Sequence, residues 1–101
     1  MGSHIVNGHD ETSKYSLNQK INRRRILLER LCLSIAMLER VSPRQVLTRV
    51  SLDWLAVNAP DLLNEPCRLK ALRRVPGLGP RRIHRHGAEI LACLESCEES
   101  P

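Results

Sequence analysis

The sequence has no phenylalanine, and its aromatic residues are Tyr15 and Trp54 alone. No segment alternates apolar and polar residues with a period of two, which is the pattern of a half-buried β-strand. Because strands are enriched in aromatic residues, this shortage also argues against a sheet. Apolar runs are short, as in residues 35–38, so no segment is expected to span a membrane. The composition therefore predicts an all-α protein.

The four cysteines form no Cys-x-x-Cys pair, and the chain shows no apolar core of a secretory signal. A disulfide framework and a zinc site are therefore both disfavoured, and buried cysteines are expected to pack as small apolar side chains. Cys93 and Cys97 lie one helical turn apart, and they could bind a metal with His84 or His86 only if two helices converged. We expect no metal, no cofactor and an intracellular location, in a bacterial cytoplasm or nucleoid or a eukaryotic nucleus.

A length of 101 residues predicts one domain, and we expect a monomer. Residues 1–15 have no apolar period and are predicted to be a disordered leader, in which Met1–His4 resembles an expression-vector scar. The folded domain is expected at residues 16–98. Ser16 and Gln19 fit a capping box, which predicts that the first helix begins there and runs to about Arg40. Its inward face is expected to contain Leu17, Ile21, Leu28, Leu31, Cys32, Ile35 and Leu38.

Three further helices are predicted before the most informative motif. Ser42-Pro43-Arg44-Gln45 repeats the capping signal and begins a short helix to about Thr48. Ser51 is expected to cap a helix over residues 52–58 that Ala59-Pro60 ends, with Trp54 at the core or its rim. After a loop or single turn over residues 61–66, a fourth helix is predicted over residues 67–74. Its inward side chains, with the residue that follows it, are expected to be Leu69, Leu72 and Val75.

The most informative segment is Val75-Pro76-Gly77-Leu78-Gly79-Pro80. Both glycines can adopt positive φ, so the chain can reverse sharply while Leu78 fills the gap between two helices. Pro80 is suited to begin the fifth helix. The backbone amides of Leu78, Gly79, Arg81 and Arg82 can then approach a phosphate at a helix N-terminus. The segment is therefore predicted to be a phosphate cradle.

Basic residues are concentrated around this turn. Residues 66–87 contain seven bases and no acid, whereas residues 88–101 contain four acids and no base. The acid-free segment is the candidate for binding a polyanion. A second basic cluster, Lys20 and residues 23–25, is interpreted as a solvated helix face or a disordered entry to the helix rather than as a contact surface.

These residues resemble a helix-hairpin-helix, and residues 22–94 resemble the HRDC domain, the helicase-and-RNase-D C-terminal module. The resemblance lies in a long amphipathic first helix, a Ser-Pro-initiated short helix, a Leu-x-x-Leu-Ala helix ending in proline, and Leu-x-x-Val-Pro-Gly-Leu-Gly with Arg81-Arg82-Ile83 after it. It implies a compact five-helix bundle that is non-catalytic and accessory to a RecQ-type helicase or an RNase D-type nuclease.

The chain departs from that family in two ways. The family often has an aromatic pair after its first helix, where residues 44–47 read Arg-Gln-Val-Leu here, and this weakens base stacking. The connection from Pro60 to Val75 is also longer than usual.

A glycosylase-like activity is disfavoured because no aspartate follows Gly79. His84 and His86 point about 200° apart on a helix, with one expected to face solvent or phosphate while the other packs.

Two functions stay open on the residues alone. In the first, the site binds nucleic-acid backbone, single strands or duplex ends and junctions, without reading bases, and DNA is favoured over RNA. In the alternative, the same arginines dock onto a parent helicase or nuclease or another acidic partner. The candidate nucleic-acid-binding residues are Arg73, Arg74, Gly77, Leu78, Gly79, Arg81, Arg82 and Arg85.

Overall fold

This computed structural model describes the backbone of residues 2–99 and the side chains of residues 17–98. Five α-helices and one short 3-10 helix lie within residues 2–99. They are α1 (Gly2–Glu39), α2 (Pro43–Val46), α3 (Arg49–Leu63), α4 (Arg68–Ala71), η1 (Leu72–Arg74) and α5 (Pro80–Glu99). No strand occurs within residues 2–99. The predicted all-α fold with five helices is confirmed. No helix in the described part of the chain is long and apolar enough to cross a membrane.

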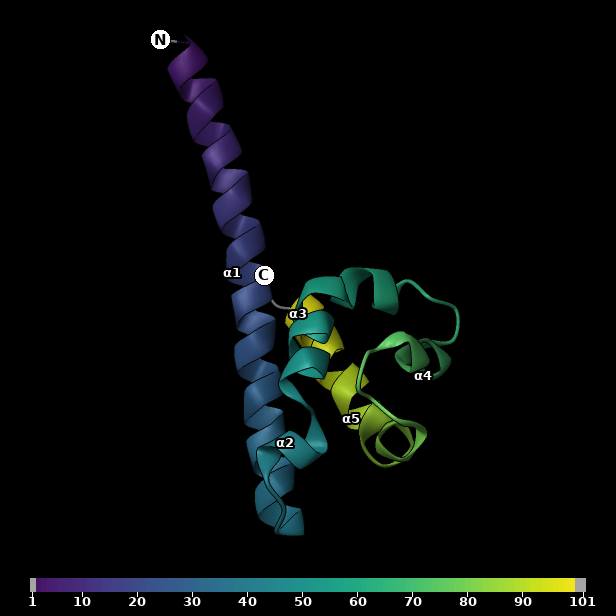
Figure 1. The fold of residues 1–101 in the computed structure, drawn as a ribbon. Coiled ribbons are helices and arrows are strands. Elements are labelled where there is room, and N and C mark those ends of the chain that lie inside the picture. The colour runs from purple at the N-terminus through teal and green to yellow at the C-terminus, as the bar shows by residue number, and fades with distance from the viewer. Residues whose placement is uncertain (1, 100–101) are drawn as a thin grey trace.

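Helix α1 begins at Gly2, so the predicted helix start at Ser16 is wrong. No proline lies before residue 43, and each residue added to an existing helix gains a hydrogen bond without a new nucleus, so the helix continues upstream. Its N-terminal half projects beyond the other helices (Figure 1). The Cα radius of gyration is accordingly 15.9 Å, against about 13 Å for a compact chain of this length. The assignment of residues 1–15 to a leader outside the folded domain stays a prediction.

The C-terminal end of α1 agrees with the predicted boundary near Arg40. Arg40 has φ 57°, in the left-handed region that usually favours glycine. The amide of Val41 donates to the Ala36 carbonyl at 3.0 Å, which is the long bond of a Schellman motif. The chain therefore leaves α1 in a tight turn that brings α2 back along it.

The core lies where α1, α3 and α5 meet. Leu28, Cys32 and Ile35 of α1 are buried, as predicted, and pack with a larger apolar set. That set includes Leu52, Leu55, Leu62, Leu72, Val75, Ile90 and Leu94. Trp54 packs partly buried against it, as expected.

Three residues assigned to the core from the sequence are exposed: Leu17, Leu38 and Leu69 have relative exposures of 57%, 84% and 49%. Helical spacing identified the correct side of α1 but not the length over which other helices cover it. Leu69 lies in α4, which has only four residues and is too short for spacing to define its buried face.

The N-terminal caps of α2 and α3 are Ser42 and Thr48. At α2, the Gln45 side chain accepts the Ser42 amide at 2.9 Å, which confirms the back-bonding half of the predicted capping box. At α3, the cap is Thr48, whose hydroxyl accepts the Ser51 amide at 3.2 Å. The prediction that Ser51 is the cap is wrong, because Thr48 one turn earlier takes that position.

Pro60 lies inside α3, so the predicted helix end at Ala59-Pro60 and the loop over residues 61–66 are wrong. A proline in a helix leaves the carbonyl four residues earlier without its donor. Here that carbonyl is Ala56, and the Nη1 of Arg24 donates to it at 2.8 Å. A side chain from α1 thus replaces the missing backbone donor.

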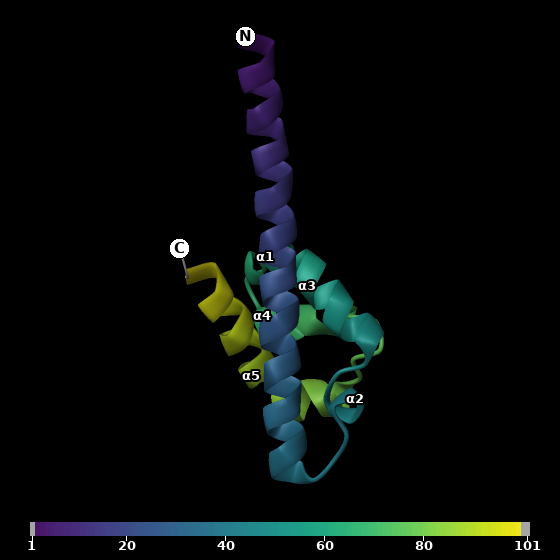
Figure 2. The same ribbon diagram turned by 90° about the vertical axis from the view of Figure 1, so that its left-hand side faces the viewer.

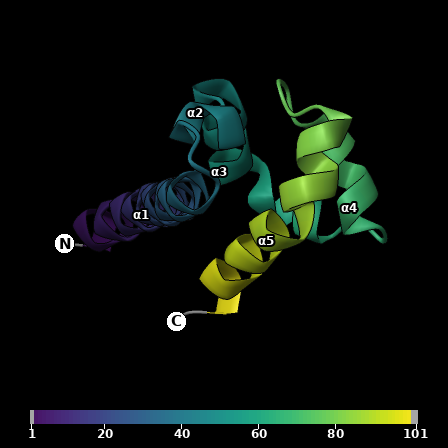
Figure 3. The same ribbon diagram turned by 90° about the horizontal axis from the view of Figure 1, so that it is seen from below.

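Arg24 is only 4% exposed and also pairs with Glu98 of α5 at 2.8 Å. It therefore joins α1, α3 and α5, and its assignment to a solvated face is wrong. Seen from below (Figure 3), α1 and α4 lie on opposite sides of the body.

Candidate nucleic-acid interface

The turn between η1 and α5 is a tight reversal held by its own backbone. Gly77 has φ +77°, as predicted, and the Leu78 amide donates to the Val75 carbonyl at 3.3 Å. Leu78 is buried at 5% exposure, so its role as the apolar filling between two helices is confirmed.

The turn is also fastened to α3. The Ser51 hydroxyl donates to the Pro76 carbonyl at 2.6 Å, and the Thr48 hydroxyl donates to Ser51 at 2.9 Å. A Cβ on Gly77 would lie 3.0 Å from the Thr48 Oγ1. Sequence reasoning assigned Ser51 to a helix cap and missed this anchor. The only local signal was a second hydroxyl three residues after the true cap.

Gly79 does not adopt the positive φ that the sequence analysis allowed for both glycines of the turn. Its φ is not positive, since Gly77 is the only glycine in that region among the described residues, and a Cβ on Gly79 would meet nothing within 4 Å. The Gly79 carbonyl accepts the Ile83 amide at 3.1 Å and so begins the hydrogen bonding of α5. Gly79 therefore leaves the surface open rather than making the reversal possible.

The predicted amide cradle is smaller than expected. The Leu78 amide is occupied within the turn, whereas the amides of Gly79, Arg81 and Arg82 have no acceptor in the described residues. These three residues and Pro80 line a shallow depression of about 500 Å³. Its open side faces solvent at the N-terminus of a 20-residue helix, where backbone N–H groups favour an anion.

The side chain of Arg82 is hydrogen-bonded to two backbone carbonyls of neighbouring segments. Its Nε donates to the Gln45 carbonyl at 2.8 Å and its Nη1 donates to the Gly77 carbonyl at 3.0 Å. It holds the turn against α2. Its Nε and Nη1 are therefore occupied by two carbonyls, and its role as a phosphate contact stays a prediction.

The remaining bases of the acid-free segment fall into two groups. Arg74 pairs with Glu65 at 3.0 Å, and Arg85 lies 3.4 Å from Glu39. In contrast, Lys70, Arg73 and Arg81 make no hydrogen bond or ion pair with any described residue, and all three are exposed. Arg73 and Arg81 stand on either side of the turn in sequence and are the free cations closest to it.

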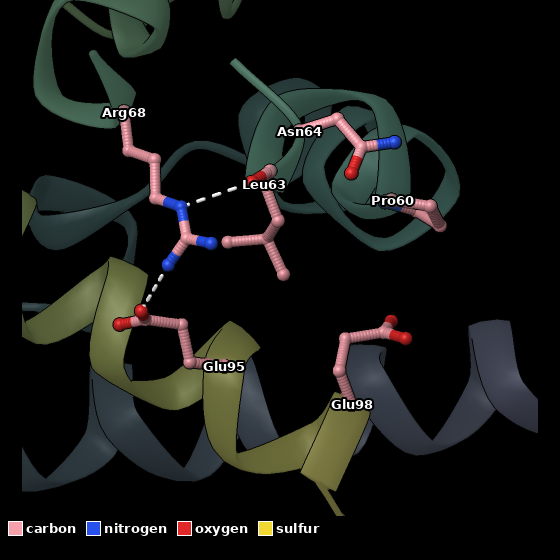
Figure 4. A pocket seen from close by; sticks show the side chains of 6 residues that line it. All are labelled: Pro60, Leu63, Asn64, Arg68, Glu95 and Glu98. Carbon is pink, nitrogen blue, oxygen red and sulfur yellow. Dashed lines mark hydrogen bonds and ion pairs between the residues drawn. The ribbon is translucent and has the colours of Figure 1, made fainter. Parts of the chain in front are cut away.

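Arg68 shows that charges separated in sequence meet in space. It donates to the Leu63 carbonyl at 2.9 Å and pairs with Glu95 of the acidic C-terminal segment (Figure 4). The pair borders a pocket of about 370 Å³ that Pro60, Asn64 and Glu98 also line. The acid-free segment is thus partly neutralised on this side, and the net positive charge is concentrated nearer the turn.

The second basic cluster contributes less free charge than its sequence indicates. Arg24 is buried, and Arg25 pairs with Asp53 of α3 at 3.0 Å. Only Lys20 and Arg23 are exposed without a partner in the described residues.

The histidines divide as predicted: His84 is exposed, and His86 is 4% exposed with its Nε2 3.9 Å from Glu39. Cys32 is fully buried, and burial raises its thiol pKa from 9.0 to about 11. Burial likewise raises the pKa of Cys93 to about 11 and that of Cys97 above its ordinary value. No group of three or more His, Cys, Asp or Glu side chains within the described part could hold a metal ion.

A long helix, a short capped helix, a proline-containing helix and a glycine turn before the last helix occur here in the order expected from the resemblance. The family model described as the HRDC domain matches residues 23–94. The chain belongs to the HRDC family. HRDC domains occur in helicases and nucleases and are generally non-catalytic accessory domains. Neither the curated proteins nor the solved structures contain a match to this HRDC chain.

Proposed function

We propose that this HRDC domain binds the sugar-phosphate backbone of nucleic acid, without reading bases, as an accessory part of a RecQ-type helicase or RNase D-type nuclease. The proposal is carried by two exposed arginines without a partner in the described residues, Arg73 and Arg81, which precede and follow the turn at Gly77 and Leu78 in the sequence, Arg81 also lining the depression there. Phosphate contacts from arginines and from helix N-terminal amides position a protein on nucleic acid without carrying sequence information.

Two neighbouring arginines extend this surface. The side chains of Arg74 and Arg85 are 54% and 66% exposed while paired with carboxylates. Exposed ion pairs of this kind contribute only about 0–1 kcal/mol, so exchanging a carboxylate for a phosphate has a small cost. Arg82 contributes indirectly, by holding the turn, together with its free N-terminal amide.

Gly79 supports the same proposal through its size. Its backbone is open on the side of the depression, and a side chain there would stand between a phosphate and the amides of Arg81 and Arg82. Base stacking is not part of the proposal, because Trp54 packs against the core and is the only aromatic residue among the described side chains. Single strands and duplex ends or junctions are therefore both candidate ligands, with DNA favoured over RNA.

The test replaces the two free cations. Arg73→Gln with Arg81→Gln should weaken binding of fluorescent single-stranded and duplex oligonucleotides equally for all sequences. The slope of log K against log salt should also become less negative, by about 1.4 on single strands or about 1.8 on duplex. These values correspond to the loss of two phosphate contacts at roughly 0.7 and 0.9 each. Fluorescence anisotropy at several salt concentrations measures both quantities.

Arg23→Gln with Arg30→Gln is the matched control, because it removes two exposed, unpaired cations from α1. Equal losses from the two double variants would leave only a diffuse basic surface and refute a site at the turn. Absence of binding to DNA and RNA at low salt would refute the proposal and favour docking of the same arginines onto an acidic protein partner.

A further inference from the structure

The side of α1 that faces away from the body carries exposed apolar residues. Ile26, Leu33 and Met37 are 54%, 48% and 81% exposed. Their spacings of seven and four residues place them within about 40° of one another around the helix, opposite the buried Leu28. In Figure 2, which looks at this side, α1 lies in front of the other helices. We call Ile26, Leu33 and Met37 the outer stripe.

One edge of the outer stripe is positively charged. Arg23 and Arg30 lie on the same side of α1, are exposed, and have no hydrogen bond or ion pair with any described residue. Of the two acids of α1 in residues 17–39, Glu39 lies near Arg85, and Glu29 lies on the other edge of the stripe, about 60° from Ile26, where its carboxylate pairs with Arg44. This face is therefore apolar with a net positive charge, and its one carboxylate is already paired.

The width and charge of the stripe decide which partner fits. A stripe of about 40° resembles the narrow seam through which two helices pack, whereas a helix lying on a membrane presents a wider apolar face. In an antiparallel pairing of two copies, the arginine edge would meet another arginine edge. In a parallel pairing it would meet the edge with Glu29, whose carboxylate is already paired with Arg44, so a second copy offers these arginines no free carboxylate. Nucleic acid would satisfy the arginines but would leave the three apolar side chains uncovered.

We propose that the outer stripe docks an acidic amphipathic helix. Apolar residues of that helix, three and four positions apart, would pack between Ile26, Leu33 and Met37, and its flanking carboxylates would pair with Arg23 and Arg30. The stripe lies on the side of α1 opposite the buried Leu28, and none of its residues belongs to η1, α5 or the turn between them, so this surface and the proposed phosphate site use different residues. The inference does not depend on nucleic-acid binding.

The probe is a 21-residue helical peptide with leucine at heptad positions a and d, glutamate at e and g, and alanine or glutamine elsewhere. Its glutamates disfavour self-pairing. The purified chain should bind this peptide more tightly than a scrambled peptide of the same composition or a version with lysine at e and g, as measured by fluorescence anisotropy. Amide chemical shifts should change along residues 22–38 and not around residues 75–82.

Ile26→Glu with Met37→Glu should weaken binding of the acidic peptide at least tenfold and leave the melting temperature unchanged, because both side chains are exposed. The matched control is Val50→Glu with Val57→Glu on α3, where the exposures are 61% and 52%, and it should change the affinity less than twofold. Arg30→Glu should weaken binding at least threefold, and Arg49→Glu should not.

Several outcomes would overturn the inference. One is an equal loss of affinity for the acidic peptide in the Ile26/Met37 double variant and in the Val50/Val57 control. The others are binding of the scrambled peptide as tight as that of the acidic peptide, and no binding of the acidic peptide at all. Stripe-dependent binding to phosphatidylserine vesicles without peptide binding would instead identify a membrane surface. A concentration-dependent dimer that the stripe substitutions abolish would identify a second copy as the occupant.

Discussion

The two basic clusters of this chain look alike in sequence and differ in the structure. In the first, on α1, Arg24 is buried against α3 and α5, and Arg25 pairs with Asp53. In the second, around the turn before α5, no arginine is buried, and Arg73 and Arg81, like Lys20 and Arg23 of the first, have no partner in the described residues. A run of arginines therefore does not by itself indicate a solvated face or a binding surface. The acceptors that the fold brings to each guanidinium decide which it is.

The largest expected effect comes from removing Arg24. Arg24→Met should lower the free energy of unfolding by about 2–3 kcal/mol, because the Ala56 carbonyl loses its donor and the charged bond to Glu98 disappears. The melting temperature should fall by roughly 10–20 °C in a circular-dichroism melt. Arg23→Met, which removes an exposed arginine, should leave it nearly unchanged.

A double-mutant cycle isolates the carbonyl. Pro60→Ala restores an amide donor to Ala56, so it should stabilise the Arg24→Met variant by about 1 kcal/mol more than it stabilises the wild type. Equal effects in both backgrounds would mean that the proline and the arginine are independent.

A smaller effect should separate the two glycines of the turn. Gly77→Val should lower the free energy of unfolding by about 1–3 kcal/mol, because valine is strained at positive φ and its Cβ would crowd Thr48. Gly79→Val should lower it by less than about 1 kcal/mol, the order of a poorer helix cap. Urea unfolding measures both, and similar losses would show that Gly79 also shapes the turn.

The smallest effect depends on pH. The pKa of the Cys32 thiol is raised from 9.0 to about 11 in the folded chain, so the folded state holds its proton to higher pH than the unfolded state. The protonated thiol therefore contributes its full stabilisation of the folded state below pH 9, and this contribution is lost as the pH rises toward 11. The free energy of unfolding should fall by about 1–2 kcal/mol from this cause by the top of that window. Cys32→Ala should flatten the fall of urea stability with pH, and Cys67→Ala, at an exposed thiol, should not.

Features that depend on neighbouring residues could be predicted from the sequence. The reversal at Gly77, the burial of Leu78 and the start of α5 at Pro80 all follow from local backbone preference, and the structure has each of them. The predicted fold class is right for the same reason, since helical spacing and the shortage of aromatic residues act along the whole chain.

Features that depend on distant partners could not be predicted. Pro60 ends a helix by local rules, but here Arg24, 36 residues earlier, supplies the missing donor. Arg82 has the appearance of a phosphate ligand until α2 places the Gln45 carbonyl beside it. The candidate site is therefore predicted well in its backbone and less well in which of its arginines are free.

The bond between Arg24 and the Ala56 carbonyl also has a consequence for how this sequence can change over generations. Losing Pro60 first leaves a chain that has gained a backbone donor, and Arg24 then becomes replaceable. Losing Arg24 first leaves an unsatisfied carbonyl in the core of a small domain. The two positions should therefore be lost in that order, and related chains with proline at this place in α3 should keep a side-chain donor at the place of Arg24.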